Sequence, residues 1–143
     1  MSTPRWTAQP PPRLAAPVHE GIVSTPADLT MLRADLHRQV VRALPPRSAA
    51  EDVDRLLLTF EELASNGLRH GRRPIRVLVS QDDTGWLIDV SDGAPDSPPS
   101  FAVGRDPAEG GLGLYLIARL SSAYGWWING TRKHVWALIR PAT

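Results

Sequence analysis

The chain has 143 residues and a formal net charge of +1, with 16 Lys and Arg residues against 15 Asp and Glu residues. That length suits a single domain, and the near-neutral charge gives no overall attraction to nucleic acid or to a membrane. The absence of Cys excludes a disulfide framework, a thiol nucleophile and a thiolate zinc site. The only Lys, Lys133, is followed by His134, so the chain has no Walker A loop. No apolar run suits a membrane span or a signal peptide, and we therefore expect a soluble, cytoplasmic protein.

Prolines crowd the start of the chain, where five fall within the first 17 residues. Proline lacks a backbone donor and disfavours helices, so this composition predicts a flexible Pro-rich tail over residues 1–17. The remaining residues, 18–143, are expected to form one domain. The stretch Gln9–Arg13 is also a poor version of a Pro-rich docking ligand, and that alternative stays open.

The first half of the domain has helical patterns. After a short strand over 18–24, Thr25-Pro26-Ala27-Asp28 is typical of a helix start, and apolar residues at helical spacing run from Leu29 to Leu44. A second helix is predicted to begin at Ser48-Ala49-Ala50-Glu51 and to reach Arg69 or His70, with Gly71 as its end.

The second half alternates with a period of two. Strands are predicted over 75–79 and 86–91, followed by a long Gly- and Pro-rich loop over 93–113. A third helix is expected over 114–123, and then a hairpin that turns at Asn129-Gly130 and ends near Ile139. This order predicts an α+β fold: a two-layer α/β sandwich whose mainly antiparallel sheet is covered on one face by helices.

Three side chains of the second helix form one stripe. Glu62, Asn66 and His70 follow one another at intervals of four residues, at the margin of the apolar face. Such a stripe is suited to the wall of a ligand pocket, but spacing alone also fits an ordinary solvated helix margin. Glu61 lies on the opposite shoulder of the helix and is the weaker candidate.

Two further clusters follow in the sequence. Asp92 ends a predicted strand before Gly93-Ala94-Pro95, where its carboxylate could accept a hydrogen bond from an exocyclic amine or simply form an Asp-Gly turn. Gly110-Gly111-Leu112-Gly113 precedes the third helix, and glycines there let backbone N–H groups approach an anion at a positive helix end.

In this order, the three clusters resemble the motifs of the GHKL (Bergerat-fold) ATPases. Glu62–Gly71 is similar to the N-box, Asp92–Pro95 to the G1 box, and Gly110–Gly113 to the G2 box. The segment Lys133–Ala137 resembles the closing strand of the anti-sigma-factor, serine-kinase-like branch. The resemblance covers roughly residues 20–140 and implies ATP and Mg²⁺ as cofactors.

The resemblance implies a role for each matching residue. Glu62 would be the catalytic general base, Asn66 a ligand of Mg²⁺, and Asp92 the partner of the adenine amine, with Ala94 in the turn that follows. Gly110, Gly111, Leu112 and Gly113 would line the triphosphate, and residues 96–110 would form an ATP lid in which Arg105 meets the γ-phosphate. His70 would support the pocket, and His134 stands where a Thr or Ser often supports the adenine contact.

The resemblance also implies partners. Proteins of this branch bind an RNA polymerase sigma factor and phosphorylate a STAS-type antagonist, often as homodimers, and the helix over 29–44 is the expected dimer or partner face. The alternative is a non-catalytic module that uses ATP only to order a surface for a signalling partner. Binding of nucleic acid through Arg69–Arg73 and Trp126-Trp127 is the least favoured hypothesis, because cations are favoured at a helix end in any case.

Overall fold

The computed structural model describes residues 6–14, 16–94 and 111–142. The elements follow one another as β1 (Ala16–Val23), α1 (Pro26–Val40), α2 (Ala50–His70), β2 (Ile75–Asp82), β3 (Gly85–Asp92), α3 (Gly111–Leu120), β4 (Ala123–Asn129) and β5 (Arg132–Ile139). The strands form one sheet in the order β1-β2-β3-β5-β4, and every neighbouring pair is antiparallel.

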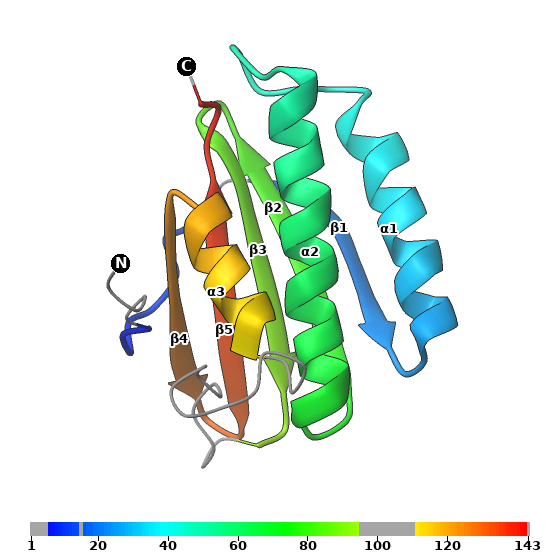
Figure 1. The fold of residues 1–143 in the computed structure, drawn as a ribbon, viewed down its shortest axis with the longest axis vertical. Helices are drawn as coiled ribbons and strands as arrows, with labels where there is room; N and C mark the ends of the chain where they lie inside the picture. The colour runs from blue at the N-terminus through cyan, green and yellow to red at the C-terminus, as the bar shows by residue number, and fades with distance from the viewer. Residues whose placement is uncertain (1–5, 15, 95–110, 143) are drawn as a thin grey trace.

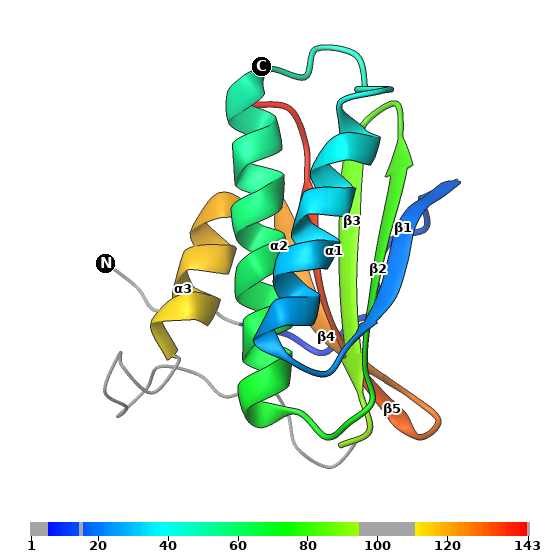
Figure 2. The same cartoon turned by 90° about the vertical axis from the view of Figure 1, so that its right-hand side faces the viewer.

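All three helices cover the same face of this sheet, with α2 between α1 and α3 (Figures 1 and 2). This arrangement confirms the predicted α+β fold, a two-layer sandwich. Of the helices in the described part of the chain, none is long and apolar enough to cross a membrane.

The core lies between the sheet and the helices because the strands alternate as predicted. Trp86, Ile88 and Val90 of β3 are buried on the helix side, and their register partners on β5 are Ile139, Ala137 and Val135. From the other layer, α2 contributes its own apolar side chains, with Phe60 and Leu56 fully buried. Each such side chain stabilises the fold by about 1.5–3 kcal/mol relative to an exposed one.

The helix boundaries follow local capping chemistry. Thr25 Oγ1 accepts from the Asp28 N–H at 3.1 Å, which forms the predicted start of α1. The second helix begins at Ala50 rather than at Ser48, because the Asp52 carboxylate accepts from the Ala49 N–H at 2.9 Å. The predicted extension of α1 to Leu44 is wrong, since the helix ends at Val40 and Val41 caps it.

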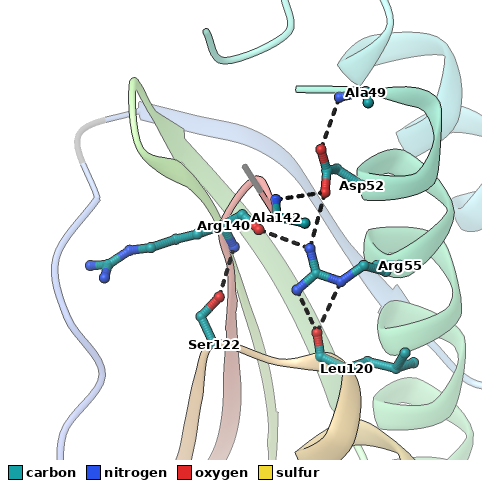
Figure 3. A network of polar contacts seen from close by, with 7 residues as sticks. All are labelled: Ala49, Asp52, Arg55, Leu120, Ser122, Arg140 and Ala142. Atoms are coloured by element: carbon teal, nitrogen blue, oxygen red, sulfur yellow. Dashed lines mark hydrogen bonds and ion pairs between the residues drawn. The ribbon is translucent and has the colours of Figure 1, made fainter. Parts of the chain in front are cut away.

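A polar network joins the start of α2 to the ends of α3 and β5 (Figure 3). The guanidinium of Arg55 donates to the carbonyl oxygens of Leu120 and Arg140, and it also pairs with the Asp52 carboxylate. Asp52 accepts in turn from the Ala142 N–H at 3.0 Å. Burial raises the pKa of Asp52, but the hydrogen bonds from Ala49, Ala142 and Arg55 together hold that pKa below its usual value.

Residues 6–14, which we expected to belong to a flexible tail, contact the sheet. Trp6 is buried, with its ring centroid 4.6 Å from that of Tyr124. The Gln9 N–H donates to the Trp126 carbonyl at 2.8 Å, so the segment runs beside the edge strand β4. On the sheet face away from the helices, Leu14 packs against a small cluster formed by Leu87, Trp136 and Leu138. This part of the chain therefore covers both an edge and part of the outer face of the sheet.

Candidate functional site

The N-box residues lie on the second half of α2. Glu62 is half-buried, while His70, the last residue of the helix, is exposed. Asn66 is 7% exposed, and its Oδ1 has no hydrogen-bond partner among the described residues. A buried amide oxygen without a partner is costly, so this atom is suited to bind a ligand. Thr59, one turn before Glu62, likewise has a buried hydroxyl with no partner in the described ranges.

The G1 box forms the end of β3. Asp92 is buried on the helix side of the sheet, and its Oδ1 accepts from the Ala94 N–H at 2.6 Å. The Gly93 N–H donates to the Arg72 carbonyl at 2.7 Å, which ties this turn to the loop after α2. A Cβ added to Gly71 would lie only 2.9 Å from Asp92 Oδ2, so the end of α2 closely approaches this carboxylate.

The G2 box begins α3, which starts at Gly111 rather than at the predicted Leu114. Gly111, Leu112 and Gly113 thus belong to the first helical turn, whose N–H groups are the natural partners of an anion. Two other predicted site residues, Arg105 and Gly110, lie outside the described residues together with the whole expected lid over 96–110.

The structure brings the N-box and the G2 box into contact. A Cβ built on Gly113 would lie 2.7 Å from Glu62 Oε2 and 3.9 Å from Arg69 Nη2. Arg69, predicted as a helix-end cation or a nucleic-acid contact, follows Glu62 by seven residues, and this helical spacing places it on the same side of α2. A carboxylate and a guanidinium therefore both lie beside the first turn of α3.

The three boxes gather at one end of the molecule. The end of α2, the end of β3, the start of α3 and the start of β5 all lie at the lower end in Figure 1. The α3 helix lies beside α2 in both views, and its N-terminus faces this end (Figures 1 and 2). The backbone segments that carry the three boxes thus lie at the same end of the molecule.

Lys133 is a site residue that the sequence analysis missed. It lies opposite Asp92 in the register of β3 and β5, and its Nζ is 3.5 Å from Asp92 Oδ2. The signal was present in the strand alternation, because Lys133 shares the face of the buried residues Val135 and Ala137.

His134, which stands where a Thr or Ser often supports the adenine contact, has its side chain on the other face of the sheet from Asp92. His134 Nδ1 lies 2.9 Å from Asp89 Oδ1, whereas Asp92 is on the helix side of the sheet. Both border a hollow of about 500 Å³ on the outer face, together with Arg76, Arg132 and Ser91. Burial lowers the pKa of Arg132, and the nearby guanidinium of Arg76 lowers it further. This hollow is separated from the three boxes by the sheet.

The described side chains can supply only some of the oxygen ligands that a hard divalent cation such as Mg²⁺ needs. In the described part of the chain, no three His, Asp or Glu side chains cluster in a way that would hold a metal ion. Mg²⁺ is usually held by one or two protein oxygens together with waters and substrate phosphates. The buried, unpartnered Asn66 Oδ1 fits that mode of binding.

The aromatic pair near the end of the chain divides between two environments. Trp126 is partly buried against the core, while Trp127 is 38% exposed. Alternation along β4 predicted that one of the two would point outward. Arg69 and Arg72 are exposed at the end of α2, where their charge is also favoured by the helix dipole.

Comparison with known proteins identifies the family. The model of the histidine kinase-like ATPase domain matches residues 23–138. The chain therefore belongs to the histidine kinase-like ATPase domains of the GHKL superfamily, in agreement with the three boxes and the fold. A search of curated proteins gives no match to this chain.

Proposed function

We propose that this chain is an ATP-binding regulatory protein that acts as an anti-sigma factor and as a switch serine/threonine kinase. Membership of the histidine kinase-like ATPase family supports ATP binding. The finer assignment is supported by the similarity of Lys133–Ala137 to the closing strand of the serine-kinase-like branch. The proposed substrate is a Ser or Thr hydroxyl of a STAS-type antagonist.

The contact between Glu62 and Gly113 carries the proposal. Phosphoryl transfer depends mainly on positioning and on neutralising charge, with a base near the attacking hydroxyl. The carboxylate of Glu62 lies beside the first turn of α3, where the resemblance places the triphosphate. A protein that only bound ATP would not need a carboxylate at this point, which favours the kinase over the non-catalytic module.

Each residue of the site has a separate role in the proposed phosphoryl transfer. Glu62 takes the proton from the hydroxyl of the antagonist as the new O–P bond forms and the bond to ADP breaks. The N–H groups of Gly111 and Gly113 donate to phosphate oxygens, and Arg69 adds positive charge near them. Asn66 would hold Mg²⁺ through Oδ1, and the cation neutralises phosphate charge when it is bound.

The test is phosphoryl transfer to the antagonist. The full chain is incubated with Mg²⁺, γ-labelled ATP and a STAS-type antagonist encoded in the same genome, and label on a Ser or Thr is measured by mass spectrometry. Transfer by the wild type supports the kinase. Binding of ATP without any transfer to the antagonists of that genome would instead support the non-catalytic module.

We also propose a sigma factor as a partner and a homodimer as the assembly, with α1 as the contact face. Met31 of α1 is 66% exposed, which leaves apolar surface of this helix available for a partner. Light scattering of the wild type and of Met31→Glu, with and without sigma factor, tests both proposals. A monomeric wild type that does not bind sigma factors with ATP present would contradict them.

A further inference from the structure

Asp92 and Lys133 form a buried ion pair at the candidate site. Their side chains are 7% and 6% exposed, and Lys133 Nζ lies 3.5 Å from Asp92 Oδ2. Lys133 is the only Lys of the chain. The two residues are register partners on β3 and β5, so their backbones lie side by side in the sheet. Their side chains lie on the face that α2 and α3 cover.

The separation of the two groups is wider than that of a tight charged hydrogen bond. Such bonds between an ammonium and a carboxylate are usually 2.7–2.9 Å long. The other oxygen of Asp92 already accepts from the Ala94 N–H, which fixes the orientation of the carboxylate. Burying two charges costs about as much as their attraction returns, so a buried pair is weak evidence for a role in stability. The pair includes the first residue of the G1 box and lies close to the end of α2, which points instead to recognition.

The structure assigns a second base-reading residue: we propose that Lys133 donates a hydrogen bond to N1 of adenine while Asp92 accepts from the N6 amine. This inference rests on the proposed binding of ATP and goes beyond the contact of Asp92 alone. A carboxylate can only accept and an ammonium can only donate. The pair thus presents an acceptor, Asp92, beside a donor, Lys133. The edge of adenine is complementary, because it has a donor at N6 beside an acceptor at N1.

The same pair discriminates against the other common purine edge. Guanine and hypoxanthine carry an acceptor at position 6 and a donor at N1, which is the reverse order. In the same orientation, their O6 would face the Asp92 carboxylate and their N1–H would face the Lys133 ammonium. Both contacts are then repulsive and leave buried charges unpaired, which is the kind of mismatch that gives high selectivity. A Ser or Thr in place of Lys133 could both donate and accept and would lack this constraint.

Binding of base analogues to the full chain tests the inference. Calorimetry with Mg²⁺ measures the affinity of the wild type for ATP, 1-deaza-ATP, purine riboside triphosphate and ITP. A hydrogen bond to a charged group corresponds to roughly a 10- to 100-fold change in affinity. We expect 1-deaza-ATP, which lacks the N1 acceptor, to bind the wild type weaker by that factor, and ITP to bind weaker still.

Lys133→Met then separates the two contacts, with Arg76→Met on the outer face of the sheet as the control. In Lys133→Met, ATP and 1-deaza-ATP should bind equally, whereas purine riboside triphosphate should still bind more weakly than ATP because it lacks the N6 amine. Arg76→Met should keep the wild-type preferences. Equal affinity of the wild type for ATP and 1-deaza-ATP would overturn the inference alone, and this comparison needs no variant to fold. Failure of the wild type to bind any of these nucleotides would overturn the proposed function as well.

Discussion

The guanidinium of Arg55 donates two hydrogen bonds to the carbonyl oxygen of Leu120, from Nε at 3.2 Å and from Nη2 at 2.7 Å (Figure 3). Arg55 lies near the start of α2 and Leu120 ends α3, so the contact joins the two helices at the end opposite the candidate site. Because α2 carries the N-box and α3 begins with the G2 box, this contact also supports the relative position of both boxes.

Arg55→Ala should destabilise the domain. The substitution removes the partner of the Leu120 and Arg140 carbonyls and leaves the buried Asp52 without its cation. We expect the free energy of unfolding to fall by about 2–3 kcal/mol, as measured by urea denaturation. Arg33→Ala is the control, because Arg33 pairs with Glu61 at 3.4 Å on the exposed surface, where a pair contributes less than about 1 kcal/mol. Equal effects of the two substitutions would contradict the role given to Arg55.

Glu62→Gln should separate catalysis from binding. The amide keeps the size of the side chain but cannot take a proton, so phosphoryl transfer should slow by about 10²- to 10⁴-fold while ATP affinity changes little. Single-turnover transfer of labelled phosphate and calorimetric ATP titration measure the two quantities. Glu61→Gln, on the exposed shoulder of the same helix, is the matched control and should transfer phosphate normally. If Glu62→Gln lost binding together with transfer, Glu62 would be a binding residue rather than a base.

Asn66→Ala should weaken the effect of Mg²⁺ on ATP binding. The side-chain oxygen of Asn66 is the buried atom that we assign to the cation, and its loss should cost at least about tenfold in the affinity gained from Mg²⁺. ATP titrations with Mg²⁺ and with EDTA give this ratio directly. Ser65→Ala, one residue earlier on another face of α2, should keep the wild-type ratio. An unchanged ratio in Asn66→Ala would argue against the assigned ligand.

Gly71→Ala should disturb the adenine contact. Its Cβ would lie 2.7 Å from the Gly67 carbonyl oxygen and 2.9 Å from Asp92 Oδ2, so either the end of α2 or the Asp92 carboxylate must move. We expect lower stability and a loss of ATP affinity of at least tenfold. Gly130→Ala provides the contrast, because Gly130 has open space but a φ of +61°, so its cost of about 1 kcal/mol comes from backbone strain alone. That variant should bind ATP normally.

The sequence was sufficient to predict the layers of the fold, because the period of apolar residues differs between helix and strand. It failed where a contact between distant residues decides the outcome. Trp6 lies in a Pro-rich stretch without periodicity, and only its packing against Tyr124 makes it part of the core. The first turn of α3 was predicted as a loop, because glycine has a low helix propensity. Propensity takes no account of the packing against the sheet and α2 that supports this helix.

For the candidate site, the sequence predicted the residues that stand in motifs but not those whose position depends on strand register. Glu62, Asn66 and Asp92 stand in motifs whose order along the chain is informative, and the structure places Asn66 and Asp92 among the buried polar residues. Lys133 begins the segment that resembles the closing strand, but the resemblance gives it no role, and its importance follows from the register that places it opposite Asp92. His134, the next residue, lies on the opposite face, because successive side chains of a strand point to opposite faces of the sheet.

His19 should make the domain less stable as the pH falls below about 6.5. It is 8% exposed, its Nε2 has no hydrogen-bond partner among the described residues, and Phe60 packs against it edge to face. Burial lowers the pKa of His19 below its ordinary value. Between that lowered pKa and about 6.5, the unfolded state binds more protons than the folded state, so stability rises with pH in this window and is lost as the pH falls through it.

His19→Leu removes this proton linkage while it keeps an apolar contact with Phe60. Urea denaturation at pH 7.5 and at pH 5.5 should show a loss of stability on acidification in the wild type that is smaller in His19→Leu. The window stays above the range where carboxylates titrate, so Asp28 and Asp52, whose pKa values are lowered, contribute little to the difference. His37→Gln, at an exposed position of α1, should retain the wild-type dependence. The same dependence in His19→Leu as in the wild type would mean that another group titrates in this window.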